Sequence, residues 1–449
     1  MEWCTRSVRD MRIINLTPGT GSWHCGSCLR DSTLITALRK SGHDAIMVPM
    51  YLPLLTEGPA PTQGAPLFYG GVNVYLQQKS GIFRRTPRWL DQRLDSPALL
   101  RAAGRRSGMT SARDLGALTL SMLKGEEGNQ IKELQRLTAW MVLDGKPDAI
   151  CLSNALLIGL ARHLKEIVGV PVVCTLQGED TFLDSLTEPY KTDCWRTLRE
   201  RAADVDAFLP VSHYHADVMA HRMQIDEHLL SVVYNGIDCE AIRPIDFPPD
   251  PPVVGYFARM CPAKGLETLI DAFIGLKQRQ TCTGLRLHVG GTQTGDDPAY
   301  VMKLQNRLSA RGLLSDTTFS PNLDRQSKLD FFRGLSVFSV PATYGESFGL
   351  YVLEALASGV PVVQPRHAAF PEIIEATEGG LLCEPDDPVS LANGLERLLT
   401  HPEEAREMAR RGRAAVLEKF SAYRMAEEFV SVIDNLKPVK VDTIPEPIR

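Results

Sequence analysis

The chain has 449 residues, 44% of them hydrophobic, which is enough material for two full domains. Its 49 basic and 54 acidic residues nearly balance, so the overall charge does not indicate a nucleic-acid partner. No apolar run approaches the length of a membrane span, the first 16 residues lack the apolar core of a secretory signal, and the ten cysteines are scattered. We therefore expect a soluble, cytoplasmic protein.

Short apolar segments alternate with helical patterns through the first half of the chain. The expected strands are residues 11–16, 44–49, 72–76, 148–153, 170–176, 206–212 and 230–235. An amphipathic helix is predicted at 31–42, where a glycine ends it. Because apolar strands that alternate with helices are typical of parallel sheets, this half predicts an α/β domain.

A proline-rich segment at 244–252 holds five prolines in nine residues and predicts a stiff linker. The strands expected after it are residues 253–258, 285–291, 336–342, 360–365 and 380–385, and long helical patterns follow at 402–420 and 422–436. The sequence thus predicts a first domain at 1–243, the linker 244–252, a second domain at 253–415, and a C-terminal helix and tail at 416–449 that pack toward the first domain. Two doubly wound sheets predict a ligand cleft between the domains.

Residues 84–124 are unusually basic, with eight arginines and Lys124 against three aspartates. Aromatic and leucine residues interleave with these arginines, and the strand–helix alternation weakens. A solvated helical insertion is one interpretation. The other is an element that binds an acceptor or an anionic membrane surface.

The most informative stretch is PATYGESFGLYVLEALASGVP at 341–361, where a strand leads through a small-residue turn into an apolar helix. Ser347 is predicted to cap this helix. The amides of Phe348, Gly349 and Leu350 would then face outward as an anion site, and Gly349 lets a ligand approach the backbone.

Glu346 and Glu354 flank that turn, eight residues apart. Eight helical residues span about 12 Å, so the two carboxylates cannot form a dyad and are predicted to contact different parts of one extended ligand. An anion site between two separated carboxylates suits a nucleotide sugar. The alternative is that both are ordinary solvated charges.

Two cations follow the first strand of the second domain. Arg259 comes directly after the strand, and Lys264 lies at a helix start introduced by Pro262. Cations at the carboxyl end of a strand, beside a helix N-terminus, are typical of a diphosphate clamp. Either residue could instead be a surface base.

A glycine-containing loop follows the first strand of the chain. Gly19 and Gly21 would let a phosphate or a sugar lie against the backbone, although their spacing fits no dinucleotide fingerprint. The same loop contains His24, Cys25 and Cys28. These are too few ligands for a structural zinc site, so loop packing is favoured over metal or redox chemistry.

Taken together, these segments resemble the retaining glycosyltransferases of the GT-B fold, a large family that includes bacterial mannosyltransferases and the sucrose and glycogen synthases. The segments are the glycine loop, RKSGHDA at 39–45, YNGID at 234–238, the Arg259/Lys264 pair, and GESFGLYVLEALASGVPVV at 345–363. The resemblance is strong from 209 to 421 and thin across 52–145. It implies two Rossmann-like parallel-sheet domains that face each other across a cleft.

The resemblance also implies roles for matching residues. Arg259 and Lys264 would hold the donor diphosphate, Glu346 would contact the donor hexose, and Glu354 would accept the ribose hydroxyls; the first three form the predicted catalytic set. The remaining implied contacts are the amides of Phe348, Gly349 and Leu350 to sugar and phosphate, Gly19 and Gly21 to the diphosphate, and Asn322 with its neighbours to the nucleobase.

One departure from the family concerns Gln177, which stands where such enzymes often have a histidine near the donor sugar. Glutamine hydrogen-bonds a sugar but cannot relay a proton near neutrality. The expected function is hexosyl transfer from a nucleoside-diphosphate sugar to an unidentified hydroxyl acceptor, which is a glycan, a lipid or a small molecule. No cofactor, metal or nucleic acid is expected, and peripheral membrane contact is left open. A nucleotide-sugar epimerase and a non-catalytic binding protein are the alternatives.

Overall fold

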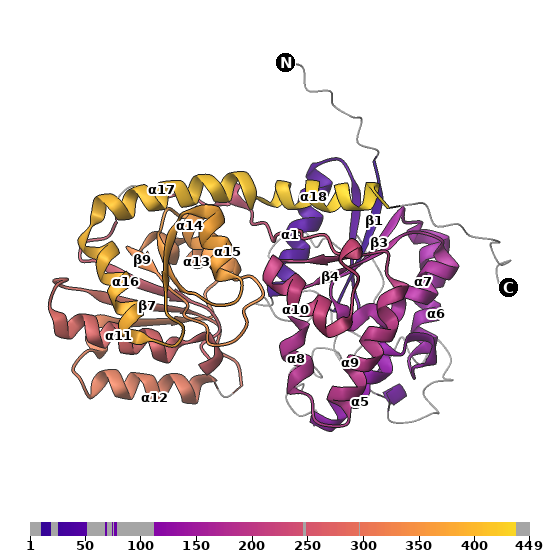
Figure 1. The fold of residues 1–449 in the computed structure, drawn as a ribbon, viewed down its shortest axis with the longest axis horizontal. Coiled ribbons are helices and arrows are strands. Elements are labelled where there is room, and N and C mark those ends of the chain that lie inside the picture. The colour runs from indigo at the N-terminus through magenta and orange to yellow at the C-terminus, as the bar shows by residue number, and fades with distance from the viewer. Residues whose placement is uncertain are drawn as a thin grey trace, which may run out of the picture. The chain divides into compact units, whose positions relative to one another are not determined.

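The computed structural model describes residues 10–18, 26–51, 68–69, 74, 76–78, 112–245, 248–295 and 297–436. The chain divides into two compact units, each built around one sheet (Figure 1). The first unit comprises Met1–Tyr234 and Met425–Arg449, and the second comprises Asn235–Arg424. The domain boundaries that the sequence places at 243 and 415 lie near this division and stay a prediction.

The first unit contains a five-stranded parallel sheet in the order β2-β1-β3-β4-β5. Its strands are β1 (Arg12–Thr17), β2 (Asp44–Pro49), β3 (Ala149–Leu152), β4 (Val172–Leu176) and β5 (Ala207–Pro210). The register places Ile14 between Ile46 and Ile150, and all three side chains are buried. The chain reverses its direction of progress across the sheet between β1 and β3, as a doubly wound fold does.

The helices of this unit bury one face each against the sheet or against one another. They are α1 (Gly26–Lys40), α5 (Ala112–Leu123), α6 (Ile131–Trp140), α7 (Ala161–Val168), α8 (Glu179–Ser185), α9 (Tyr190–Arg201) and α10 (His213–Met223). The helix predicted at 31–42 is α1, and Gly42 follows it with a left-handed φ of 96°. Such a conformation favours glycine and stops the helix.

The second unit contains a six-stranded parallel sheet in the order β11-β10-β9-β6-β7-β8. Its strands are β6 (Val253–Phe257), β7 (Arg286–Gly291), β8 (Thr317–Pro321), β9 (Val337–Phe338), β10 (Val362–Pro365) and β11 (Gly380–Cys383). Strands β7 and β8 extend the sheet to one side of β6, and β9 to β11 extend it to the other. The order therefore reverses between β6 and β9.

Helices follow most strands of this second sheet. They are α11 (Leu266–Arg279), α12 (Asp297–Ser309), α13 (Arg325–Arg333), α14 (Leu350–Ala357), α15 (Phe370–Thr377), α16 (Pro388–Thr400) and α17 (Pro402–Lys419). Helix α18 (Ala422–Asp434) begins in this unit and continues into the first. Both long helical patterns predicted near the end of the chain are thus confirmed.

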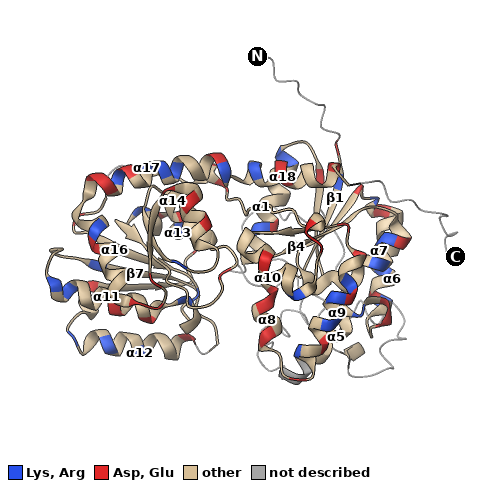
Figure 2. Cartoon of the chain, in the orientation of Figure 1, with Lys and Arg blue, Asp and Glu red and all other residues tan. Residues whose placement is uncertain are grey.

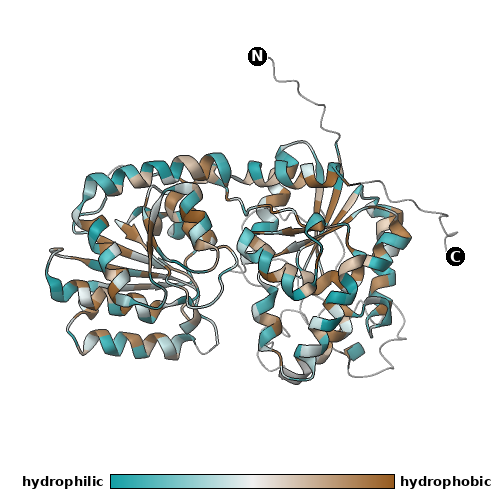
Figure 3. Ribbon diagram, in the orientation of Figure 1, coloured by the Kyte–Doolittle hydropathy of each residue, from teal (hydrophilic) through white to brown (hydrophobic). Residues whose placement is uncertain are grey.

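Hydrophobic residues concentrate on the strands, and the helices contain both hydrophobic and hydrophilic residues (Figure 3). Every residue of β3, β4, β5 and β10 is buried, which explains why these segments lack polar alternation. Helix α17 instead carries both signs of charge along its length (Figure 2), with ion pairs such as Arg406–Glu403 and Arg410–Glu407 one turn apart.

Two predicted strands are wrong. Residues 74 and 76–78 are helical where a strand was expected at 72–76, because a short, mostly apolar segment fits either period. Residues 230–235 run beside β5, where the amide of Ser231 donates to the carbonyl of Phe208, but they form only one isolated bridge. The other predicted strands are confirmed, although β9 has only two residues.

Candidate functional site

The second sheet reverses its strand order between β6 and β9, and parallel sheets bind ligands at the carboxyl ends of strands at such a point. Lys264 lies in the loop after β6, and Glu346 lies in the loop after β9. The Lys264 ammonium forms an ion pair with Oε2 of Glu346 and also donates to the hydroxyl of Tyr344. The structure therefore brings together two of the three predicted catalytic residues across the reversal point.

Close approach of two backbones makes this pairing possible. Gly265, which precedes α11, has a left-handed φ of 69°. A Cβ atom built on it would lie 1.7 Å from the carbonyl oxygen of Pro341, far inside any permitted contact. The absent side chain lets the start of α11 lie directly against the segment that leads to Glu346.

The carboxylate of Glu346 is nearly enclosed, since the residue is 8% exposed. Burial alone raises its pKa, but the charge of Lys264 and hydrogen bonds from Lys264, Tyr351 and Tyr344 outweigh that effect, so the pKa lies below the ordinary value of 4.5. The Tyr351 hydroxyl donates to Oε2 at 2.8 Å. Burial and the neighbouring carboxylate raise the pKa of Tyr351, which therefore remains a donor.

The lowered pKa of Glu346 has a consequence for stability. In a group whose folded pKa lies below its unfolded value, the ionised state contributes stability that is fully present above the unfolded pKa and is lost as pH falls through the folded pKa. We expect Glu346→Gln to lower the free energy of unfolding at pH 7, and the difference from wild type to shrink below about pH 4. Chemical denaturation at a series of pH values measures this.

Glu384→Gln is the matched control for that series, because Glu384 is exposed. It should change the free energy of unfolding little at any pH. A difference between Glu346→Gln and wild type that does not vary with pH would contradict the assigned ion pair.

Arg259 lies two residues after β6 and forms a bidentate pair with Asp297 at the start of α12. The Nε–Oδ2 and Nη2–Oδ1 distances are 2.8 and 3.1 Å. The side chain of Arg259 is 53% exposed, whereas that of Asp297 is 6% exposed. Although burial opposes ionisation of Asp297, hydrogen bonds from Arg259 and Thr294 lower its pKa. Arg259 is thus held by a buried carboxylate with half of its surface open to a ligand.

The start of α14 differs from the prediction. Ser347 is not the N-cap; Gly349 occupies that position with a left-handed φ of 91° and no side-chain cap, and α14 begins at Leu350. The prediction was wrong because a serine just before an apolar helix is the usual capping signal, whereas here the left-handed Gly349 takes the N-cap position without a side-chain hydrogen bond. Phe348 is buried at 2% exposure. Gly349 and Leu350 remain at the helix start, as predicted.

Glu354 lies in the second turn of α14 and pairs with Lys328 of α13, with Nζ 2.6 Å from Oε1. Glu346 therefore precedes the helix while Glu354 is within it, and each has its own cation. That the two glutamates do not form a dyad stays a prediction, and their separate cations support it. The roles that the sequence assigns to them stay predictions.

Asn322 follows β8 and has a left-handed φ of 56°. Its backbone amide donates to the carbonyl of Gly291 at 2.7 Å, and its side-chain Oδ1 accepts from the backbone amide of Gln293 at 3.2 Å. The side chain thus shapes the turn at the end of β8, and its contact with a nucleobase stays a prediction.

In the first unit, Gln177 follows β4, and its Nε2 donates to the carbonyl of Ser153 at 2.6 Å. The neighbouring Glu179 accepts from the amides of Ala155 and Gln177 and lies 3.5 Å from His215. Its buried carboxylate therefore holds the loop together. Gln177 stays a predicted sugar contact.

Gly19, Gly21, His24 and Cys25 lie outside the described residues, and Cys28 lies on α1. Over the part of the chain that is described, no three His, Cys, Asp or Glu side chains form a group that could hold a metal ion.

Most of the basic segment 84–124 also lies outside the described residues, and its described part belongs largely to α5. None of the described helices is long and apolar enough to cross a membrane.

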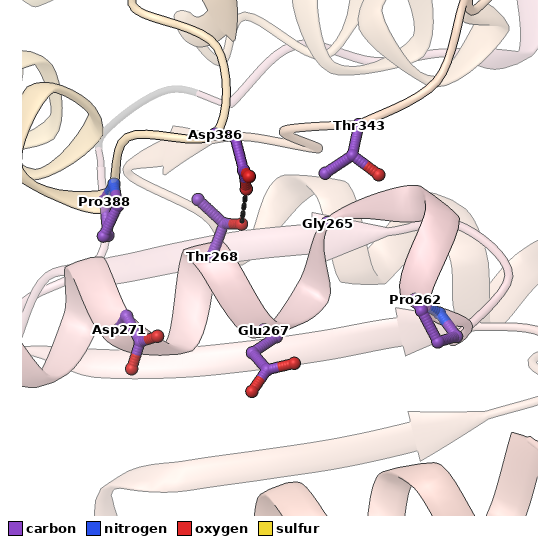
Figure 4. Close-up of a pocket in the computed structure, with 8 residues that line it drawn as sticks. All are labelled: Pro262, Gly265, Glu267, Thr268, Asp271, Thr343, Asp386 and Pro388. Carbon is purple, nitrogen blue, oxygen red and sulfur yellow. Dashed lines mark hydrogen bonds between the residues drawn. The ribbon is translucent and has the colours of Figure 1, made fainter.

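A pocket of about 290 Å³ lies beside the start of α11 (Figure 4). It is lined by Pro262, Gly265, Glu267, Thr268, Asp271, Thr343, Asp386 and Pro388. The hydroxyl of Thr268 donates to Asp386 at 3.3 Å, and Arg307 pairs with Glu267 and Asp271. Because its ionisable lining residues are all acids, this pocket is unsuited to a diphosphate.

Several residues at the site were missed by sequence reasoning: Asp297, Lys328, Tyr344 and Tyr351. Tyr344 and Tyr351 lie within the stretch 341–361 and could have been considered, because they flank Glu346. Asp297 and Lys328 carry no local signal. Their pairing depends on which strands are neighbours in the sheet.

Two family models match the chain. Residues 239–415 match "Glycosyl transferases group 1", and residues 121–241 match "Glycosyltransferase Family 4". The first match contains every predicted site residue of the second unit, and the second contains Gln177.

Curated relatives carry related names. The chain is 27% identical to a D-inositol 3-phosphate glycosyltransferase of Saccharomonospora viridis over 241 residues, covering 51% of this chain and 56% of that one. It is 27% identical over 218 residues to the lipopolysaccharide core biosynthesis mannosyltransferase LpsB of Rhizobium meliloti, covering 46% and 61%. The chain thus spans about half the length of the curated relatives it matches.

Solved structures match over nearly the whole chain. Sucrose-phosphate synthase of Thermosynechococcus elongatus matches with a TM-score of 0.67 and 18% identity, covering 94% of this chain and 98% of that one. Anabaena Alr3699/HepE in complex with UDP gives a TM-score of 0.65 and 17% identity, covering 95% and 100%. At these identities the likeness establishes the fold, and the expected GT-B architecture of two parallel-sheet domains is confirmed.

Proposed function

We propose that the chain transfers a hexosyl group from a nucleoside-diphosphate sugar to a hydroxyl acceptor with retention of anomeric configuration, and the match of residues 239–415 to the group 1 glycosyl transferases supports this. The observation that carries this proposal is the Lys264–Glu346 pair at the reversal point of the second sheet. Arg259 on the same β6 loop supplies a second, half-exposed cation. Two cations beside an enclosed carboxylate suit a ligand with both a diphosphate and sugar hydroxyls.

Within this proposal, Arg259 and Lys264 hold the donor diphosphate and stabilise the negative charge that grows on it as the glycosidic bond breaks. Both are already oriented by carboxylates, so little reorganisation is needed at the moment of reaction. Glu346 contacts the hexose, and Glu354 accepts the ribose hydroxyls. Gly349 and Leu350 offer backbone amides at the start of α14.

The proposed reaction needs no side-chain nucleophile. The bond between the anomeric carbon and the diphosphate oxygen breaks, the acceptor oxygen bonds to the same face of that carbon, and the acceptor proton passes to the departing diphosphate. The work of the protein is then positioning and electrostatic stabilisation. The two cations take the place of a metal ion in this scheme, and no cofactor takes part.

The acceptor and the hexose are not assigned. Gln177 and the glycines at 19 and 21 are proposed donor contacts from the first unit, and Asn322 is proposed near the nucleobase. A membrane-borne acceptor is a hypothesis that rests on the basic segment 84–124, and a cytoplasmic location rests on the cysteine usage. The matched families favour neither an epimerase nor a non-catalytic binding protein.

Arg259→Ala is expected to lower kcat/KM for the donor by about 100-fold, because it removes one of two groups that stabilise the leaving diphosphate. A thermal-shift panel of nucleotide sugars identifies the donor, and release of the nucleoside diphosphate then gives the rate. Arg279→Ala is the matched control, since Arg279 also pairs with a carboxylate, Glu396, and lies at the far end of α11. Near-normal turnover of Arg259→Ala would refute the proposed site.

A separate measurement tests retention. The nuclear magnetic resonance spectrum of the product gives the anomeric configuration of the new bond directly. A product inverted relative to the donor would overturn the proposed stereochemistry and leave the transferase assignment standing.

A further inference from the structure

Lys328 contacts one of the two glutamates of the candidate site and belongs to no motif. Its Nζ lies 2.6 Å from Oε1 of Glu354, and the two side chains are 23% and 21% exposed. Lys328 comes from α13, which follows β8, and Glu354 comes from α14, which follows β9. The pair therefore joins two elements that follow different strands of the sheet.

An aromatic cluster fixes the position of Lys328. Its ammonium lies 5.2 Å from the centre of the Phe257 ring, within the range of a cation–π interaction. Phe257 is the last residue of β6 and packs edge-on against Phe331, one turn along α13 from Lys328, with ring centres 5.2 Å apart. Phe331 and Phe332 are buried, at 3% and 1% exposure. Lys328 thus projects from a helix that is anchored against the same strand end that leads to Arg259.

The contact uses one oxygen of the Glu354 carboxylate. Among the described residues, Oε1 accepts a hydrogen bond from Lys328, and Oε2 accepts none. An ionised carboxylate is an acceptor with two oxygens, so Oε2 keeps its capacity to accept a ligand hydroxyl. A partly exposed glutamate would otherwise sample several rotamers. A fixed cation bound to Oε1 restricts the side chain to the rotamers that keep this contact, and these also fix the direction of Oε2.

We propose that Lys328 is a positioning residue, which holds the Glu354 carboxylate in the orientation that accepts the ribose hydroxyls of a nucleoside diphosphate. This inference rests on the proposed function. Lys328 acts through Glu354 and does not itself bind the ribose. The contrasting role is a purely structural ion pair between α13 and α14, which would affect every ligand of this unit alike.

The test compares a nucleotide that has ribose hydroxyls with one that lacks them. The 449-residue chain is titrated calorimetrically with uridine diphosphate, or with guanosine diphosphate if wild type binds that instead. It is also titrated with the matching 2′,3′-dideoxynucleoside diphosphate. For Lys328→Met, we expect affinity for the ribonucleotide to fall on the order of tenfold and affinity for the dideoxynucleotide to change less than twofold. Lys328→Arg should restore most of the lost affinity, because it retains a cation.

Two further variants make the result specific. Lys303→Met is the matched control, because Lys303 is exposed on α12 of the same unit, and it should leave both affinities unchanged. Adding Lys328→Met to Glu354→Gln should cost little beyond Glu354→Gln alone, because the lysine would have no carboxylate to hold. The non-additivity keeps the test valid if Lys328→Met is less stable.

Equal losses for the two nucleotides would overturn the positioning role in favour of a structural ion pair, and unchanged affinity for both would remove any role for Lys328. Additive effects of the two substitutions would also overturn it. If wild type binds no nucleoside diphosphate at all, the proposed function fails, and this inference fails with it.

Discussion

Lys264→Ala is expected to lower kcat/KM for the donor by about 1,000-fold, more than any other single substitution at the site. It removes one of the two cations proposed to hold the leaving diphosphate, and it also leaves the enclosed carboxylate of Glu346 without its charge partner. A buried charge that loses its partner costs about 3–5 kcal/mol, so the free energy of unfolding should fall as well. Initial rates and chemical denaturation measure the two effects.

Because two effects coincide, the double variant Lys264→Met with Glu346→Gln separates them. It removes both charges, so it should recover much of the lost stability while activity stays low. Recovery of activity together with stability would show that Lys264 acts only on the fold. Near-normal turnover of Lys264→Ala itself would exclude Lys264 from the reaction.

Gly265→Ala is expected to lower the free energy of unfolding by at least about 3 kcal/mol. The left-handed φ of 69° disfavours any side chain at this position, and the added Cβ would lie 1.7 Å from the carbonyl oxygen of Pro341. The start of α11 would have to move away from the segment that leads to Glu346. Chemical denaturation of the purified chain gives the change in stability.

Gly275→Ala, in the same helix, is the matched control. A Cβ at Gly275 meets no atom within 4 Å beyond its chain neighbours and the adjacent backbone of α11, and the residue lies in the interior of that helix. Alanine there should be neutral or stabilising by up to about 1 kcal/mol, because it favours the helix. If both variants had the same stability, the close approach at Gly265 would not be a requirement of the fold.

Much of the fold could be predicted because buried parallel strands leave a strong local signal. Segments such as 45–49 and 170–174 are continuous apolar runs, and they lead into or lie within β2 and β4. The prediction failed at 72–76, where the described residues 74 and 76 are helical, and at 230–235, which forms only one isolated bridge. A short apolar segment does not by itself distinguish a strand from a helix or a loop, because tertiary packing decides which of them forms.

The candidate site could be predicted only where its residues lie close together in sequence. Arg259 and Lys264 share one loop, and Glu346 and Gly349 share another. Asp297 pairs with a residue 38 positions away and Lys328 with one 26 positions away, so neither partnership leaves a local pattern. Ser347 shows the opposite error, since a local capping pattern is present but the backbone uses Gly349 instead.

The pairing of each site cation with a carboxylate also affects how a donor reaches the site. Arg259 faces Asp297, Lys264 faces Glu346 and Lys328 faces Glu354, so every positive charge is accompanied by a negative one a few ångströms away. Such dipoles produce a field that falls off faster with distance than that of an isolated cation. The site therefore exerts little long-range attraction on an approaching diphosphate. Capture of the donor therefore depends on short-range contacts. In these contacts, the phosphate oxygens and sugar hydroxyls bind cations and carboxylates that already hold each other in place.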